Sequence, residues 1–287
     1  EADSIDKGMG TFGKLLDRAL PSAGDTISLS IEFRIPIPET PAYVQIGLTG
    51  KAARGIDGAM TAGVTELGDP RRLEVMAQLD VRAGPDLIGL DVGGGVNFFA
   101  RAGADSTALC LKALSYGAYR RLAARSGDAA NFWALGPTSV DPKKAKKGLD
   151  EGRTWQAEAW AAMLEEQAFD KGGGYSHIGG GVGASVTAKA PGDLAEASVS
   201  AGYALFHKYD KQSLEKSMGK GTFAKPVKDK ADAQQRRKRA AGARGQAFSI
   251  SESVKVKILG QAVGFSVSLS APIPPKSFGV EIAATLE

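Results

Sequence analysis

The chain has 287 residues, of which 43% are hydrophobic and 24% are charged, and this composition indicates a globular protein rather than a disordered one. No apolar run reaches about 18 residues, so the sequence predicts no transmembrane helix. A single cysteine, Cys110, excludes an intramolecular disulfide and a cysteine-based metal site. Its position in an apolar helical stretch predicts a buried, unreactive thiol.

Residues 25–49 have the pattern of a β-hairpin. The first strand alternates strictly between polar residues and the apolar residues Ile27, Leu29, Ile31, Phe33, Ile35 and Ile37. This period of two is typical of a strand with one apolar face. Pro36 and Pro38 end the strand or place it at a sheet edge, because proline cannot donate to the strand ladder. Residues 43–49 predict the returning strand.

The same pattern returns near the C-terminus, where residues 265–274 alternate, break at Pro272 and Pro274, and resume at 278–282. Two further hairpins turn at adjacent proline and glycine residues, at 84–85 and at 191–192, because this pair favours a chain reversal. With additional strands at 56–65 and 248–258, the sequence predicts about ten antiparallel strands. The predicted fold is mainly β, an antiparallel β-barrel or strongly curved sheet built from repeated hairpins.

Two segments with helical spacing interrupt these strands. Residues 105–125 predict the first helix, with a capping residue at its start. Residues 149–169 predict the second, whose aromatic stripe is opposed by a polar side that carries Glu158, Glu165 and Glu166. We interpret the aromatic stripe as core packing rather than as a ligand-binding surface.

The charge balance changes sharply at residues 207–245. This segment holds 12 Lys/Arg and 4 Asp/Glu, a net charge of +8, whereas the whole chain carries +4. It therefore predicts a basic, flexible linker over 209–245. Within it, Arg236, Arg237, Lys238 and Arg239 would suit contact with an anionic surface, and a solvated loop is the alternative interpretation. Nucleic acid is not favoured, because only Phe223 supplies an aromatic ring for base stacking there.

Glycine-rich motifs are present, but their context argues against phosphate binding. Residues 8–13 match the pattern Gly-x-Gly-x-x-Gly, yet no strand precedes them and no parallel βαβ unit follows. The glycine runs at 93–95 and 179–181 lie inside alternating strands. We expect them to allow close backbone approach or a bend of the sheet.

Candidate catalytic and metal-ligating residues are few. His177 and His207 are the only histidines and have no cysteine partner for a zinc site. They could face one another across a hairpin, although surface positions are the favoured interpretation. Asp80, Asp91 and Glu196 are the strand carboxylates that merit inspection for acid–base chemistry. The sequence predicts no catalytic constellation, no cofactor and no metal.

The predicted organisation follows the order of these patterns. Its parts are a helical or loop lead-in at 1–24, β-hairpins at 25–101, a helical insertion at 102–172, a β-hairpin at 173–208, the basic linker at 209–245 and C-terminal β-hairpins at 246–287.

The predicted function is that of a non-enzymatic β-barrel module with a binding or structural role. Because the sequence begins at Glu1 without methionine and shows no signal peptide, we expect a processed product or a part of a longer, exported polypeptide. The alternative is a membrane-active, pore-forming or translocating barrel that approaches anionic lipid through its basic linker. Expected partners are anionic lipid or another protein, the expected location is exported or membrane-associated, and the oligomeric state is not indicated. The alternatives differ in where the apolar strand face points: outward in a membrane barrel, inward in a soluble one.

Overall fold

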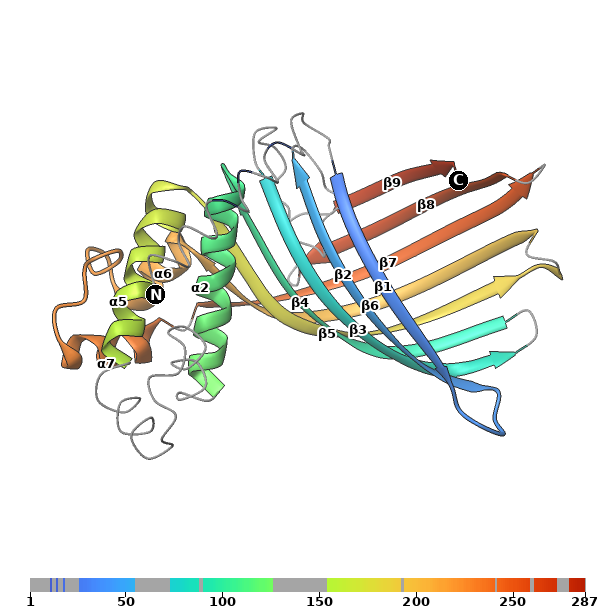
Figure 1. The fold of residues 1–287 in the computed structure, drawn as a ribbon, viewed down its shortest axis with the longest axis horizontal. Helices are drawn as coiled ribbons and strands as arrows, with labels where there is room; N and C mark the ends of the chain where they lie inside the picture. The colour runs from blue at the N-terminus through green and yellow to red at the C-terminus, as the bar shows by residue number, and fades with distance from the viewer. Residues whose placement is uncertain are drawn as a thin grey trace.

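A computed structural model shows one curved antiparallel sheet with a cluster of helices at one end (Figure 1). It describes residues 26–54, 73–87, 90–125, 154–191, 194–240, 242–258, 261–272 and 279–286, together with Thr11, Lys14 and Arg18. The predicted strand at 56–65 and nearly all of the glycine motif at 8–13 lie outside these residues.

Within the described ranges, nine strands form the sheet in the order in which they occur along the chain. They are β1 (Thr26–Pro36), β2 (Ala42–Arg54), β3 (Leu73–Leu87), β4 (Leu90–Ala104), β5 (Tyr175–Lys189), β6 (Ala195–Asp210), β7 (Ala243–Ile258), β8 (Gln261–Pro272) and β9 (Gly279–Leu286). Every neighbouring pair is antiparallel. This confirms the predicted mainly β fold of sequential hairpins. No pairing among the described residues joins β1 to β9, so the sheet is open and the predicted closed barrel is not confirmed.

The strand register sorts side chains into one apolar and one polar face. Ile31 pairs with Leu48, Leu48 with Leu79, and Leu79 with Phe98, so these side chains share a face. The residues one position away are glycine, serine, threonine or charged over most of each strand. Because successive side chains of a strand point to opposite faces, the period of two seen in β1 extends across the whole sheet.

The polar face is the concave one. Arg34 on β1 reaches Asp91 on β4 at 3.3 Å, although two strands lie between them. Tyr43 on β2 donates a hydrogen bond to the same carboxylate at 2.6 Å. In a flat sheet the backbones of β1 and β4 would lie about 14 Å apart, so these contacts indicate that the sheet curls toward its polar side. The apolar face is therefore the convex one.

Glycine allows this close approach of strands at Gly95 in the first predicted glycine run. A Cβ atom at this position would collide with the backbone carbonyl oxygen of Val81 on the neighbouring strand β3. The expectation that the glycine runs serve close backbone approach is met at this position.

The helices lie at the end of the sheet where β2, β4 and β6 finish (Figure 1). They are α2 (Thr107–Arg125), α5 (Thr154–Leu164), the π-helical turn η3 (Glu165–Lys171) that continues α5, α6 (Lys211–Met218) and α7 (Lys230–Arg239). Helix α2 packs on the apolar face of β3, β4 and β5, with Leu73, Ala102 and Ala104 fully buried beneath it. Both predicted helices are present. In addition, α6 and α7 occupy part of the segment expected to be a flexible linker.

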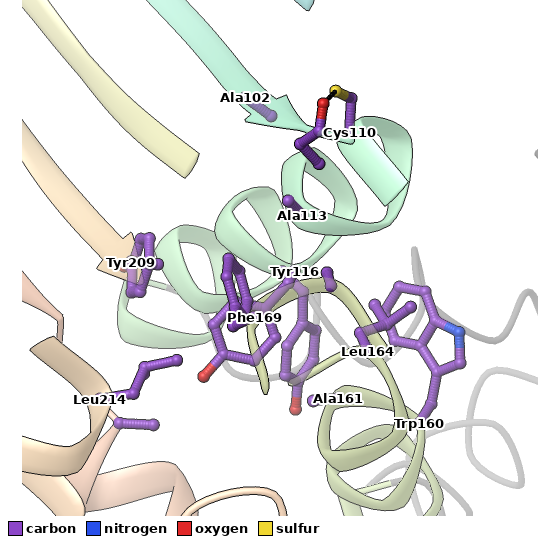
Figure 2. Close-up of a cluster of buried hydrophobic side chains, with 14 of the residues drawn as sticks. Ala102, Cys110, Ala113, Tyr116, Trp160, Ala161, Leu164, Phe169, Tyr209 and Leu214 are labelled. Carbon is purple, nitrogen blue, oxygen red and sulfur yellow. Dashed lines mark hydrogen bonds between the residues drawn. The ribbon is translucent and has the colours of Figure 1, made fainter. Parts of the chain in front are cut away.

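The core of the protein lies at the helical end of the sheet, where α2, α5 and η3 pack on one another and on strand residues such as Ala102 and Tyr209 (Figure 2). Tyr116 is its centre, with its ring edge-on to Phe169 at 5.1 Å and to Tyr209 at 5.6 Å. Cys110 is fully buried at the sheet end of this core, where its thiol donates to the carbonyl oxygen of Leu73. The predicted buried thiol is thus confirmed.

Candidate functional site

None of the described helices covers most of the apolar convex face. Leu29 is 67% exposed, Val182 is 56% exposed and Phe98 is 54% exposed, on β1, β5 and β4. The exposed large apolar residues of this face continue from β1 to β8, and the set also includes Phe33, Leu48, Leu79, Val96, Val199, Leu205, Phe248, Ile250, Phe265 and Leu269. A contiguous apolar surface that spans a whole sheet far exceeds the few hundred Å² that soluble monomers usually expose.

The uncovered part of each central strand has a defined length. In β3, Leu73 is fully buried under α2, whereas Leu79 is exposed; in β4, Ala102 is fully buried and Phe98 is exposed. This leaves roughly ten residues of each strand between the helix-covered end and the far turn, close to the 9–11 residues of a tilted transmembrane strand. At about 3.3 Å per residue and a tilt of about 45°, the band is about 23 Å tall.

The concave face has the opposite chemistry over the same length. It contains a pocket of about 170 Å³ lined in part by Gln78, Asn97, Ser185 and Ser249. Paired hydroxyl groups cross between strands, as Ser200 and Ser251 do at 2.6 Å. Small and polar side chains of this kind suit contact with water, so the sheet has one apolar face and one polar face.

Larger side chains fill the concave face at its helical end. Arg101 and His177 are 2% and 3% exposed, and the His177 ring lies 5.0 Å from that of Phe206 and 4.9 Å from that of Tyr175. The concave polar face is therefore open along the Gly- and Ser-rich part of the strands and filled by side chains beside the helices. His177 pairs in register with Lys208, and His207 pairs with Ile178, so the two histidines lie on opposite faces of the sheet. The expected surface position of His177 and the possible cross-strand histidine pair are both wrong.

A buried ion network joins the helices. The guanidinium group of Arg120 contacts both carboxylate oxygens of Glu158 at 2.8 Å and one oxygen of Glu165 at 3.2 Å. Arg236 on α7 pairs with the second oxygen of Glu165. Two arginines thus face two glutamates, and the buried charges cancel. The sequence placed Glu158 and Glu165 on a polar helix side; both are instead fully buried, because cationic partners on other helices neutralise them.

Two tyrosines complete this network. Tyr116 donates to Glu165 and Tyr119 donates to Glu158, each at 2.6 Å. Burial is the main cause that raises the pKa of both phenols above the ordinary value, and the adjacent carboxylates raise it further. Burial lowers the pKa of Arg120, but the surrounding acidic groups outweigh it and leave that pKa well above the ordinary value. The network is buried, and it joins α2, α5, η3 and α7; Nε of Arg236 is its one buried nitrogen without a hydrogen-bond partner among the described residues.

The other predicted site residues fall in separate places. In the basic run, Arg236 is buried in the ion network, whereas Lys238 and Arg239 are exposed on α7 and Arg237 is half-buried. The predicted anionic-surface contact of these four residues stays a prediction, with Arg236 already bound to Glu165. Among the strand carboxylates, Asp91 accepts bonds from Arg34 and Tyr43.

These strand carboxylates do not form an acid–base pair with one another. Asp80 accepts from Gln78, and Glu196 lies on β6 near the far turn. In the part of the chain that the structure describes, no group of three His, Cys, Asp or Glu side chains could hold a metal ion.

Comparison with known proteins adds no relative. No protein-family model matches this chain, and no curated protein matches it significantly. Within the described ranges, no helix is both long and apolar enough to cross a membrane. The feature that points to a function is the sheet itself, whose apolar face is exposed from β1 to β8.

Proposed function

We propose that this chain inserts its sheet into a lipid bilayer, where it forms the wall of a β-barrel pore. In this state the convex apolar face contacts acyl chains and the concave Gly- and Ser-rich face lines a water-filled lumen. The observation that carries the proposal is the continuous exposure of apolar side chains from β1 to β8 on one face only. A transmembrane barrel requires this alternation on every strand.

The strand edges add a second argument. The outer edges of β1 and β9 carry backbone groups without a ladder partner among the described residues. Such groups cannot remain unsatisfied in lipid, so an inserted sheet has to close, either on itself or through further copies. Because the described strands number nine, an odd number, β1 and β9 run in the same direction, and either form of closure of this sheet pairs them in parallel.

The soluble binding module remains the competing proposal. It requires a partner that covers the convex face, because the helices cover only one end of it. The membrane proposal requires no further protein, and the length of the uncovered band matches a bilayer. We therefore favour the membrane.

The test uses adjacent residues of β6 that point to opposite faces. The full chain carries Cys110→Ala and either Val199→Cys or Ser200→Cys, labelled with an environment-sensitive fluorophore, and is added to phosphatidylcholine vesicles that contain a trapped dye. We expect dye release, with a blue-shifted, lipid-quenched signal at position 199 and a water-like signal at position 200. Equal signals at the two positions, or no dye release, would contradict the proposal.

A further inference from the structure

A groove runs between α2 and the convex face where the helical cover ends. Its volume is about 790 Å³, within the range of about 300–1,000 Å³ that small-molecule sites occupy. Its walls include Leu79, Phe98, Ile178 and Leu205 of the sheet and Leu122 of α2. The groove is thus an apolar channel that opens toward the uncovered band.

Three basic side chains from three elements meet at this groove. Arg121 of α2, His207 of β6 and Arg244 of β7 all line it, and His207 pairs in register with Arg244. The guanidinium Nη1 of Arg121 donates to Nε2 of His207 at 3.3 Å. They lie on the convex face at the level where Leu205 becomes exposed, next to the apolar band rather than within it.

Among the described residues, no carboxylate neutralises the two arginines of this cluster. Arg120 and Arg236 face glutamates, and Arg34 faces Asp91. By contrast, the structure shows no carboxylate in an ion pair with Arg121 or Arg244 among the residues it describes. Two guanidinium groups beside an apolar groove favour a ligand with one anionic group and one apolar chain.

We propose that this groove binds an anionic phospholipid, with the phosphate at Arg121 and Arg244 and an acyl chain along Phe98 and Leu205. This inference rests on the proposed insertion, because the cluster lies at the height where the uncovered band ends and headgroups would begin. Arginine suits the role, since its planar group contacts a phosphate through two hydrogen bonds. The bound lipid would set the depth to which the sheet inserts into the bilayer.

The experiment compares the intact chain with the double variant Arg121→Gln, Arg244→Gln, and with a charge-matched control, Lys220→Gln, Lys228→Gln, whose lysines are exposed in the 211–242 connection. Binding is measured on phosphatidylcholine vesicles with and without phosphatidylglycerol. We expect the arginine variant to lose roughly 30-fold of its preference for the anionic vesicles, at the usual contribution of two basic residues near such a surface. An equal loss in the lysine control, or no loss in the arginine variant, would overturn the site.

A second experiment distinguishes a lipid-binding site from a site for any anion. It also tests this site independently of the proposed pore. Titration calorimetry with monomeric dihexanoyl phosphatidylglycerol, its phosphatidylcholine counterpart and inorganic phosphate should show tightest binding to the first, lost in Arg244→Gln. Equal binding of inorganic phosphate would refute the lipid assignment. If the chain binds the short lipid but releases no dye, the lipid site is supported and the pore proposal is refuted. If it releases dye but shows no preference for the anionic lipid, the pore proposal is supported and the lipid site is refuted.

Discussion

Arginine in place of Val182 tests the membrane proposal most directly. Val182 is the central residue of β5, pairs with Val96 on β4 and is 56% exposed on the convex face. In water the substitution adds a solvated side chain to a surface position and should change the free energy of unfolding by less than about 0.5 kcal/mol. In a bilayer the same side chain lies near the midplane, where arginine on the lipid face of a barrel costs about 2–4 kcal/mol.

That difference corresponds to a reduction of roughly 30- to 700-fold in the inserted fraction, since about 1.4 kcal/mol is tenfold. The assay is the protein concentration that gives half-maximal dye release from phosphatidylcholine vesicles, measured beside a urea unfolding curve. Gln78→Arg is the control, because Gln78 lines the concave pocket and its new charge would remain in water. If Val182→Arg releases dye at the same concentration as the intact chain, the convex face does not contact lipid.

Three further predictions concern the helical end. Replacing Arg120 by leucine removes a buried cation that pairs with Glu158 and Glu165. The free energy of unfolding, measured by urea denaturation, should fall by about 3–5 kcal/mol. A fall of less than about 1 kcal/mol would show that these carboxylates are not held as a charged network. Because the folded-state pKa values of Tyr116 and Tyr119 are raised, the two tyrosines ionise in the unfolded chain before they ionise in the folded one. The free energy of unfolding should therefore be unchanged below pH of about 10 and should fall above it by up to about 1.4 kcal/mol per pH unit per tyrosine. Tyr119→Phe should reduce this slope, and a urea midpoint that stays flat up to pH of about 11 would disprove the prediction. Gly117→Ala places a Cβ atom against the hydroxyl of Ser176, which should destabilise the α2–sheet contact by about 1–3 kcal/mol, and Ser176→Ala in the same chain should recover part of the loss in melting temperature.

The sequence is informative wherever local periodicity decides the structure. The alternation of residues 27–37 predicted both β1 and its apolar face, and the matching pattern at 265–274 predicted β8. The proline and glycine pair at 191–192 located the turn between β5 and β6. The turn predicted at 84–85 was wrong: Gly84 and Pro85 pair with β2 inside β3, and the chain reverses only after Leu87. The strand predictions succeed because a strand with one apolar face shows its register directly in the order of its residues.

Prediction failed where contacts join distant parts of the chain. Glu165 looked like a surface residue because nothing near it in sequence reveals Arg120 or Arg236 as partners. Helices α6 and α7 lie in a segment whose charge masks their few buried residues, such as Leu214 and Ala233. A signal was available in the first case: Arg120 falls at helical spacing from Cys110, Ala113 and Tyr116, on the apolar face of its helix, and a buried arginine there needs an acidic partner. The cluster of Arg121 with Arg244 has no local signal at all.

The connections between strands are short at one end of the sheet and long at the other. At the far end no more than five residues separate β1 from β2, β3 from β4, β5 from β6 and β7 from β8. At the near end, α2, α5, η3, α6, α7 and the buried ion network lie between β4 and β5 and between β6 and β7. Four short connections can pass through a bilayer at modest cost, but a folded helical cluster with a charged interior cannot. On the proposed function, every inserted copy would therefore share one orientation, with its turns on the distal side and its helices on the side from which it arrived.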